Sequence, residues 1–174
     1  MKSVRKFDQS LSWRQARSAD LADIYDISER LHIALPERIE VFEDKLKVFP
    51  EGCFVLERDK SVVGYGLSHP WRLRDVPPLN KLLRQVLSSP ECLLIHDVAV
   101  LPQARGNGAS RVLVERLTKL AISRGIGTLA LVSVYNTRPL WRRVGFQVTP
   151  ADGALRDQLK SYGDSACYMV AKLI

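Results

Sequence analysis

The 174-residue chain has few cysteines, no long hydrophobic run and no block of like charges. Its three cysteines lack the spacing of a metal site, so we expect Cys53, Cys92 and Cys167 to be reduced thiols of a cytoplasmic protein. No stretch reaches the length of a membrane span. The basic N-terminus is not followed by an apolar segment, which argues against a secretory signal. Neither a metal nor a membrane is therefore expected in its function.

Basic residues outnumber acidic ones, 26 to 19, and the formal net charge is +7. A basic surface favours anionic partners, such as polyphosphate cofactors, nucleic acids or acidic lipids. However, lysines and arginines are spread along the whole chain without a run of five, and no aromatic-rich binding motif accompanies them. Nucleic-acid binding is therefore the less favoured interpretation of the charge.

Hydrophobic periodicity predicts one α/β domain over residues 13–174, preceded by a flexible lead-in at 1–12. The expected strands are 13–17, 53–57, 61–69, 93–100, 128–134, 145–148 and 167–173, and the second and third of these form a hairpin. The expected helices are 21–31, 39–49, a short one within 79–87, then 109–121, 136–144 and 155–159. The continuous apolar run 128–134 is typical of a strand buried on both faces of a parallel sheet.

The most informative stretch is 93–110, where an apolar strand leads through a loop with two glycines into a helix. Pro102 follows the strand at once and cannot join a sheet ladder. Glycines before a helix leave backbone N–H groups free at the positive end of the helix dipole, which suits a phosphate or pyrophosphate. The loop lacks the lysine and Ser/Thr of a P-loop, and Arg111 stands where the dinucleotide fingerprint needs a third glycine.

The sequence VAVLPQARGNG at 98–108 resembles motif A of the GNAT superfamily of acyl-CoA-dependent N-acyltransferases. The segment LWRRVGF at 140–146 is similar to the (F/L)(Y/W)xxxGF signature of that family, and the likeness extends over about residues 13–173. The resemblance implies a mixed, centrally splayed β-sheet flanked by helices in a single domain. It also implies transfer of an acetyl group from acetyl-CoA to a primary amine by direct attack, without a covalent enzyme intermediate.

The resemblance further implies where acetyl-CoA binds. Its pantetheine arm would dock like an added strand on the backbone of Val98, Ala99 and Val100, and the N–H near Val98 would polarise the thioester carbonyl. Asn136 would contact the cosubstrate from the opposite side. The backbone N–H groups of the loop would hold the pyrophosphate, and these belong to Arg105, Gly106, Asn107, Gly108, Ala109 and Ser110.

Two steps of the implied reaction need a proton-transferring group. A base must accept a proton from an ammonium whose pKa is about 10 if it resembles lysine. His96 and Asp97 are the candidates, and as neighbours on a strand we expect them to point to opposite faces, so that one faces the cleft. The alternative is that this polar pair only orients a loop or completes a buried hydrogen-bond network.

Trp141 occupies the position where many family members carry a tyrosine that protonates the leaving thiolate. An indole N–H is not a useful acid, so either another group, such as Tyr135, takes that role or the thiolate leaves with help from solvent. The same substitution favours a second interpretation, a non-catalytic acyl-CoA-binding or regulatory domain of the same fold. A basic nucleic-acid-binding domain is the third.

Several other residues have two interpretations. Trp71 with His69 either lines the acceptor cleft or packs in the core, Tyr162 and Tyr168 are expected in the core, and His32 is expected at a helix surface. The acceptor amine, of a small molecule or of a protein, is not identified by the sequence. Nor does the sequence decide between a monomer and a homodimer.

Overall fold

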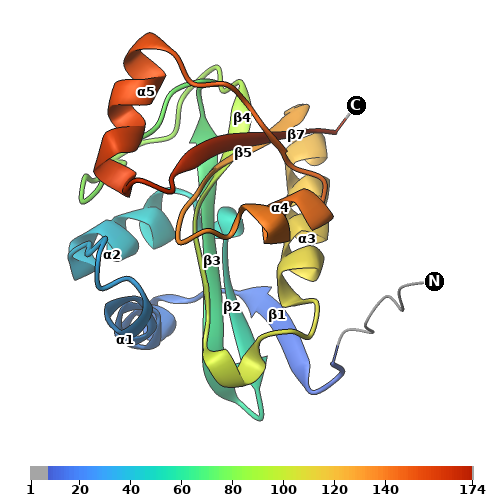
Figure 1. The fold of residues 1–174 in the computed structure, drawn as a ribbon. Coiled ribbons are helices and arrows are strands. Elements are labelled where there is room, and N and C mark those ends of the chain that lie inside the picture. Colours follow the sequence, from blue (N-terminus) through green and yellow to red (C-terminus); the bar gives the residue numbers. More distant parts are fainter. Residues whose placement is uncertain (1–7, 174) are drawn as a thin grey trace.

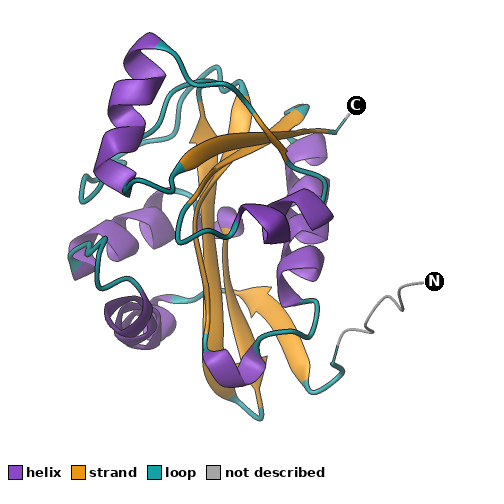
Figure 2. Ribbon diagram, in the orientation of Figure 1, coloured by secondary structure: helices purple, strands orange, loops and turns teal. Residues whose placement is uncertain are grey.

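The computed structural model describes residues 8–173, which form a seven-stranded mixed sheet with helices on both faces (Figures 1 and 2). Only β4 and β5 run parallel, and the other neighbouring strands are antiparallel. The strand order is β1-β2-β3-β4-β5-β7-β6. The strands are β1 (Leu11–Gln15), β2 (Cys53–Arg58), β3 (Ser61–Trp71), β4 (Cys92–Val100), β5 (Thr128–Ser133), β6 (Gln147–Val148) and β7 (Cys167–Lys172).

Helices α1 (Leu21–Leu31), α2 (Ile39–Val48) and α5 (Gly153–Leu159) lie on one side of the sheet, and α3 (Ala109–Ser123) and α4 (Arg138–Arg143) lie on the other (Figure 1). Helix α3 buries the apolar face that its sequence period predicts. Its buried side chains include Leu113, Leu117 and Ala121, each four residues from the next. The predicted α/β architecture with a mixed sheet is confirmed.

The predicted short helix within 79–87 is wrong, because this segment has no helix in the structure. Its backbone N–H groups are bonded to carboxylates elsewhere in the chain. Those of Leu83 and Arg84 donate to Asp44 of α2 at 2.5 and 3.0 Å, and that of Asn80 donates to Glu37 at 2.8 Å. Asn80 and Arg84 also have φ angles of 59° and 64°, which a helix does not permit. Tertiary contacts have overridden the local apolar spacing here.

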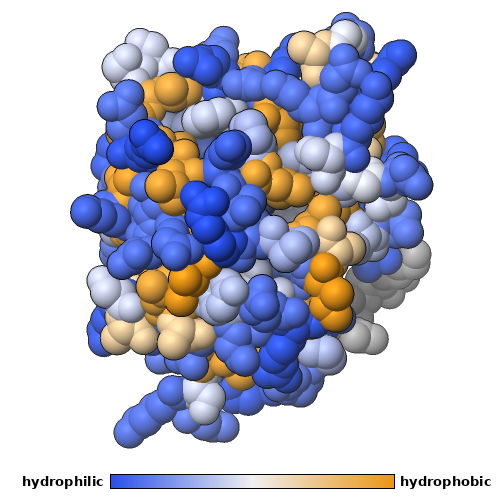
Figure 3. All heavy atoms as spheres, turned by 90° about the vertical axis from the view of Figure 1, so that its left-hand side faces the viewer, coloured by the Kyte–Doolittle hydropathy of each residue, from blue (hydrophilic) through white to orange (hydrophobic). Residues whose placement is uncertain are grey.

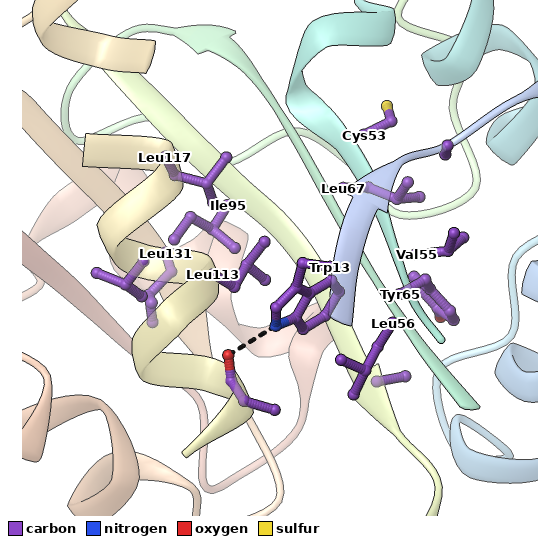
Figure 4. Close-up of a cluster of buried hydrophobic side chains, with 14 of the residues drawn as sticks. Trp13, Cys53, Val55, Leu56, Tyr65, Leu67, Ile95, Leu113, Leu117 and Leu131 are labelled. Carbon is purple, nitrogen blue, oxygen red and sulfur yellow. Dashed lines mark hydrogen bonds between the residues drawn. The ribbon is translucent and has the colours of Figure 1, made fainter. Parts of the chain in front are cut away.

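The first strand begins at Leu11, inside the lead-in predicted for 1–12, whose residues 1–7 lie outside the described part. Trp13 of this strand is 3% exposed and packs beside Leu113 in the main apolar cluster (Figure 4). Its indole N–H donates to the carbonyl of Ala109 at 2.9 Å. Because Ala109 is the first residue of α3, this hydrogen bond ties the sheet edge to the helix that follows the glycine loop.

We expect Trp13→Phe to lower the free energy of unfolding by about 2 kcal/mol, since it removes both a buried hydrogen bond and part of a packed ring. Urea denaturation monitored by circular dichroism measures the change. Trp71→Phe is the matched control, because the indole N–H of Trp71 has no hydrogen-bond partner among the described residues. Equal losses in the two variants would show that the bond to Ala109 contributes nothing.

Candidate functional site

The sheet opens between its two parallel strands. Pairing of β4 with β5 covers only Leu93–Ile95 against Leu129–Leu131. Beyond these residues β4 continues alongside β3 as far as Val100, and β5 continues alongside β7 as far as Ser133. The backbone groups of β4 that face β5 after Ile95 therefore have no strand partner in the described chain. This divergence is the central splay that the sequence resemblance implies.

A β-bulge lies in β4 at the start of the opening. Leu67 of β3 is paired with Asp97, but the next residue, Ser68, is paired with Ile95, so His96 is an extra residue. The extra residue interrupts the alternation of side chains. Both His96 and Asp97 consequently contact the segment around the end of α1 and the loop before α2. The prediction that these two side chains point to opposite faces was wrong for this reason.

His96 forms a buried pair with Glu37, a residue that the sequence analysis did not single out. Its Nε2 lies 2.8 Å from Glu37 Oε1, and the two side chains are 4% and 7% exposed. Burial alone would raise the pKa of Glu37, but the charge and hydrogen bond of His96, with Lys45 and the N–H of Asn80, hold it at about 2. The pair joins the loop before α2 to the sheet.

Asp97 is held from two sides. The Tyr65 hydroxyl donates to its Oδ2 at 2.5 Å, and His32 Nε2 lies 2.7 Å from its Oδ1 with angles outside those of a hydrogen bond. The expectation that His32 lies at a helix surface was wrong, because it is the C-cap residue of α1 and turns toward β4, with 13% of its side chain exposed. Burial lowers the pKa of His32, but the Asp97 carboxylate and then Glu37 raise it, and the net shift is upward.

Tyr135 follows the end of β5 and lies on the same side of the opening as His32. Its ring stacks on His32, with the centroids 5.7 Å apart and the planes at 11°. Burial, and then the charge of Asp97, raises the pKa of its hydroxyl. Tyr135 and Asn136 both have left-handed backbones, with φ of 52° and 58°, and this sharp turn is what brings the ring back over the opening.

The wall of this polar region contains further buried groups. Lys45 of α2 is 3% exposed, and its pKa is lowered by burial although Glu37, Asp44 and Asp97 act in the opposite direction. His69 is 1% exposed, and burial followed by the charges of His96 and Lys45 lowers its pKa to about 3, so it is neutral. Tyr162 and Tyr168 are buried in the second apolar cluster, as predicted.

His69 is buried and Trp71 packs against the second apolar cluster, which agrees with the core interpretation, whereas a role in lining the acceptor cleft stays a prediction. The Trp71 ring meets His69 edge-on, at 5.3 Å between centroids, and His69 lies 5.9 Å from His96. Trp71 is partly buried and packs against the second apolar cluster.

The outer surface of the α1, α2 and α5 side shows hydrophilic and hydrophobic groups interleaved (Figure 3).

The glycine loop lies at the start of α3, on the other side of the sheet. Gly106 and Gly108 have φ of 80° and 75°, and Gly108 is the N-cap residue of α3 without a side-chain cap. This conformation requires glycine and leaves the first N–H groups of the helix for an anion. The side chain of Asn107 donates to the carbonyls of Ala104 and Arg105, at 3.3 and 3.2 Å. Arg105 Nε donates to the Val100 carbonyl at 2.8 Å.

The two remaining residues that the sequence singled out, Asn136 and Trp141, differ in exposure. Asn136 is exposed at the turn after β5, where its N–H donates to Ser165 Oγ at 3.4 Å. Trp141 is 8% exposed, packs edge-on against Phe146, and donates its indole N–H to Thr137 Oγ1 at 3.2 Å. The Trp141 ring is therefore part of the core beneath α4.

Two surface hollows lie away from this region. One, of about 540 Å³, is lined by Phe54 and residues of α3, and the other, of about 530 Å³, lies between α2 and residues 84–86. Neither is lined by Glu37, His96, His32 or Asp97. Within residues 8–173 no cluster of three or more His, Cys, Asp or Glu residues is arranged to hold a metal ion. None of the helices in this part has the length and apolar character that a bilayer crossing requires.

Comparison with known proteins gives consistent matches. The model of the acetyltransferase (GNAT) family matches residues 18–146. Streptothricin acetyltransferase of Streptomyces lavendulae is 38% identical over 80 residues, which are 44% of this chain and 42% of that protein. This chain thus spans less than half the length of that relative.

Two solved structures show the same fold. N-acetylglutamate synthase from Neisseria gonorrhoeae, complexed with coenzyme A and N-acetyl-glutamate, superposes with a TM-score of 0.71 at 23% identity, over 94% of this chain and 35% of that one. The loading GNATL domain of CurA from Lyngbya majuscula superposes with a TM-score of 0.76 at 15% identity, over 94% and 98% of the two chains.

The low pKa of Glu37 predicts a pH dependence of stability. A carboxyl whose pKa is 4.5 when unfolded and about 2 when folded stabilises the fold above pH 4.5, and this contribution is lost as the pH falls toward 2. We expect Glu37→Gln to lower the free energy of unfolding by about 2–3 kcal/mol at pH 6, and the difference from wild type to shrink between pH 4.5 and 2. Urea denaturation at several pH values measures it. Glu40→Gln, at an exposed position of α2, is the control and should change little.

Proposed function

This chain belongs to the acetyltransferase (GNAT) family, and we propose that it transfers the acetyl group of acetyl-CoA to a primary amine by direct attack. The observation that carries the proposal is the opening between β4 and β5, with the glycine loop of α3 on one side of the sheet and paired ionisable groups on the other. Such an opening gives a thioester access from the cosubstrate side and an amine access from the opposite side.

The residues present fit acetyl-CoA. The unpaired edge of β4, at Val98, Ala99 and Val100, would accept an extended chain that carries amides, as the pantetheine arm does. The backbone N–H groups of residues 105–110 would bind the pyrophosphate, and Asn136 would contact the cosubstrate from the β5 side. Arg105 Nε donates to the Val100 carbonyl, whose second lone pair would remain for an incoming amide N–H.

Direct attack is supported by the protonation state of the two buried cysteines. Burial raises the pKa of Cys53 and Cys92 to about 12, so at neutral pH both are thiols and neither is an activated nucleophile. The backbone N–H near Val98 would stabilise the oxyanion that forms when the amine attacks the thioester carbonyl. Two buried thiols also fit a reducing compartment, and we propose the cytoplasm.

His96, Asp97 and Tyr135 are the proposed groups for proton transfer. Asp97 is the more exposed of the first two, at 13% against 4%, which favours it over His96 for a part in proton transfer from the amine, directly or through a side chain that it contacts. His96, enclosed by Glu37, would hold the loop before α2 in place. Tyr135, at the end of β5, would protonate the leaving thiolate, because Trp141 uses its N–H within the core.

Calorimetric titration with acetyl-CoA, followed by a thiol-release assay, tests the proposed function. The amines to offer are L-lysine methyl ester, spermidine, kanamycin and a peptide with a free N-terminal alanine. Saturable binding with thiol release would support the transferase. Binding without release to any amine would favour a non-catalytic acyl-CoA-binding domain, for which the buried indole of Trp141 is the argument. Absence of binding would refute both.

Gly108→Val should abolish acetyl-CoA binding while the protein stays folded, because its side chain would enter the space proposed for the pyrophosphate. Gly125→Val is the matched control, since Gly125 has the same left-handed backbone, φ 71°, beyond the other end of α3 with open space around it. Both variants carry similar backbone strain, of about 1–2 kcal/mol. Calorimetric titration measures binding. Loss of affinity in both variants alike would contradict the proposed site.

Tyr135→Phe should lower kcat about 10–100-fold, because the ring and its stack on His32 remain while the acidic hydroxyl is lost. The affinity for acetyl-CoA should not change. Steady-state kinetics with the best amine of the panel measure the effect. Tyr25→Phe on α1 is the control, since the Tyr25 ring packs against Phe42. An unchanged kcat in Tyr135→Phe would assign protonation of the thiolate to solvent.

A further inference from the structure

Three side chains lie next to one another at the opening between β4 and β5, on the side that faces α1 and α2. Asp97 projects from β4, Tyr135 follows the end of β5, and His32 from the end of α1 lies between them. His32 contacts Asp97 at 2.7 Å on one side and stacks on Tyr135 on the other. These three side chains therefore border the side of the opening that faces α1 and α2.

The position of His32 is fixed by several independent contacts. Its backbone N–H donates to the carbonyl of Ser28 at 2.7 Å, which ends α1 at this residue. Asp97 is itself fixed by the Tyr65 hydroxyl and by the bulge in β4. Tyr135 holds its ring on His32 through a left-handed backbone, a conformation that persists only where the surroundings stabilise it. An incidental surface histidine would not have such support.

The surroundings of His32 raise the pKa of its imidazole above the ordinary value. The groups that face it are Asp97 from β4, Tyr135 from the end of β5 and Glu37 from the loop before α2, and the two carboxylates both raise its pKa. His69 is neutral and fully enclosed, and His96 is 4% exposed against Glu37, whereas His32 remains 13% exposed. His32 is therefore the most exposed of the three histidines. Its Nε2 is buried against Asp97, so a proton from an ammonium would go to its Nδ1.

We propose that His32 accepts the proton of the acceptor ammonium and that Asp97 holds the resulting imidazolium. This inference rests on the proposed function. The ammonium gives one proton to the neutral imidazole, and the freed electron pair of the amine forms the C–N bond to the acetyl carbon. The C–S bond then breaks, its electron pair leaves with the sulfur, and the second amine proton reaches the thiolate by way of Tyr135. The products are the N-acetyl compound, CoA thiol and one proton on His32, which is returned to water.

His32→Asn tests this assignment, with Arg30→Gln in the exposed last turn of α1 as control. We expect kcat to fall about 10²–10⁴-fold in His32→Asn, with the affinity for acetyl-CoA unchanged. In wild type, kcat/KM should rise with pH through an apparent pKa above 6.5, because the base must be unprotonated, and this limb should disappear in the variant. A wild-type rate and pH profile in His32→Asn would overturn the assignment.

Chemical rescue separates proton transfer from a structural role. Added imidazole should restore part of the activity of His32→Ala, because the native His32 side chain is partly exposed to solvent. It should not restore the activity of His96→Ala, because the native His96 side chain is enclosed. Equal behaviour of the two alanine variants would count against His32.

A titration followed by NMR tests the same group without turnover. The three histidines make assignment of the ring signals simple. We expect His32 to titrate above pH 6.5 in wild type, and at a lower pH in Asp97→Asn. Titration of His32 at or below pH 6.5 in wild type would overturn the proposal. If wild type releases no thiol with any amine of the panel, the proposed function fails and this inference fails with it. If wild type is active and His32→Asn equals it, only the inference fails.

Discussion

The short pairing between β4 and β5 is the constraint on which the rest of the site depends. Three residues of each strand are in register, and beyond them each strand keeps only its outer neighbour, β3 or β7. Apolar packing holds the paired end closed: Leu93 and Leu129 are in the main cluster, and Leu94 and Ala130 are in the second cluster on the opposite face. An opening can therefore exist in the middle of the sheet while the sheet itself stays intact.

The two sides of the sheet supply different chemistry to this opening. The α3 side carries the glycine loop, which Trp13 anchors through the carbonyl of Ala109. The α1 and α2 side carries two carboxylate–histidine pairs, Glu37 with His96 and Asp97 with His32. Burying an unpaired charge would cost several kcal/mol, so each of these groups requires its partner for the fold. The stability of this side of the sheet therefore depends on both pairs.

One extra residue in β4 decides how these groups are distributed. With regular alternation, His96 and Asp97 would lie on opposite faces, and one ionisable group would face the apolar interior beside α3. The bulge brings both to the polar side. It also marks the place where pairing with β5 has ended, so the same irregularity sets the position of the ionisable groups and the start of the opening.

Local patterns in the chain determined the order of helices and strands, the single α/β domain, the membership of the family and the glycine loop. These properties depend on residues close together in sequence, such as the apolar spacing of Leu113 and Leu117 or the backbone freedom of Gly108. The tertiary structure decided the bulge, the inward turn of His32, the burial of Trp141 and the loss of the helix expected within 79–87. Each of these depends on strand register or on partners far apart in the chain: Tyr65 lies 32 residues from Asp97, and Glu37 lies 59 residues from His96. No local pattern encodes such partners, because a side chain finds them only when the elements that carry them have packed.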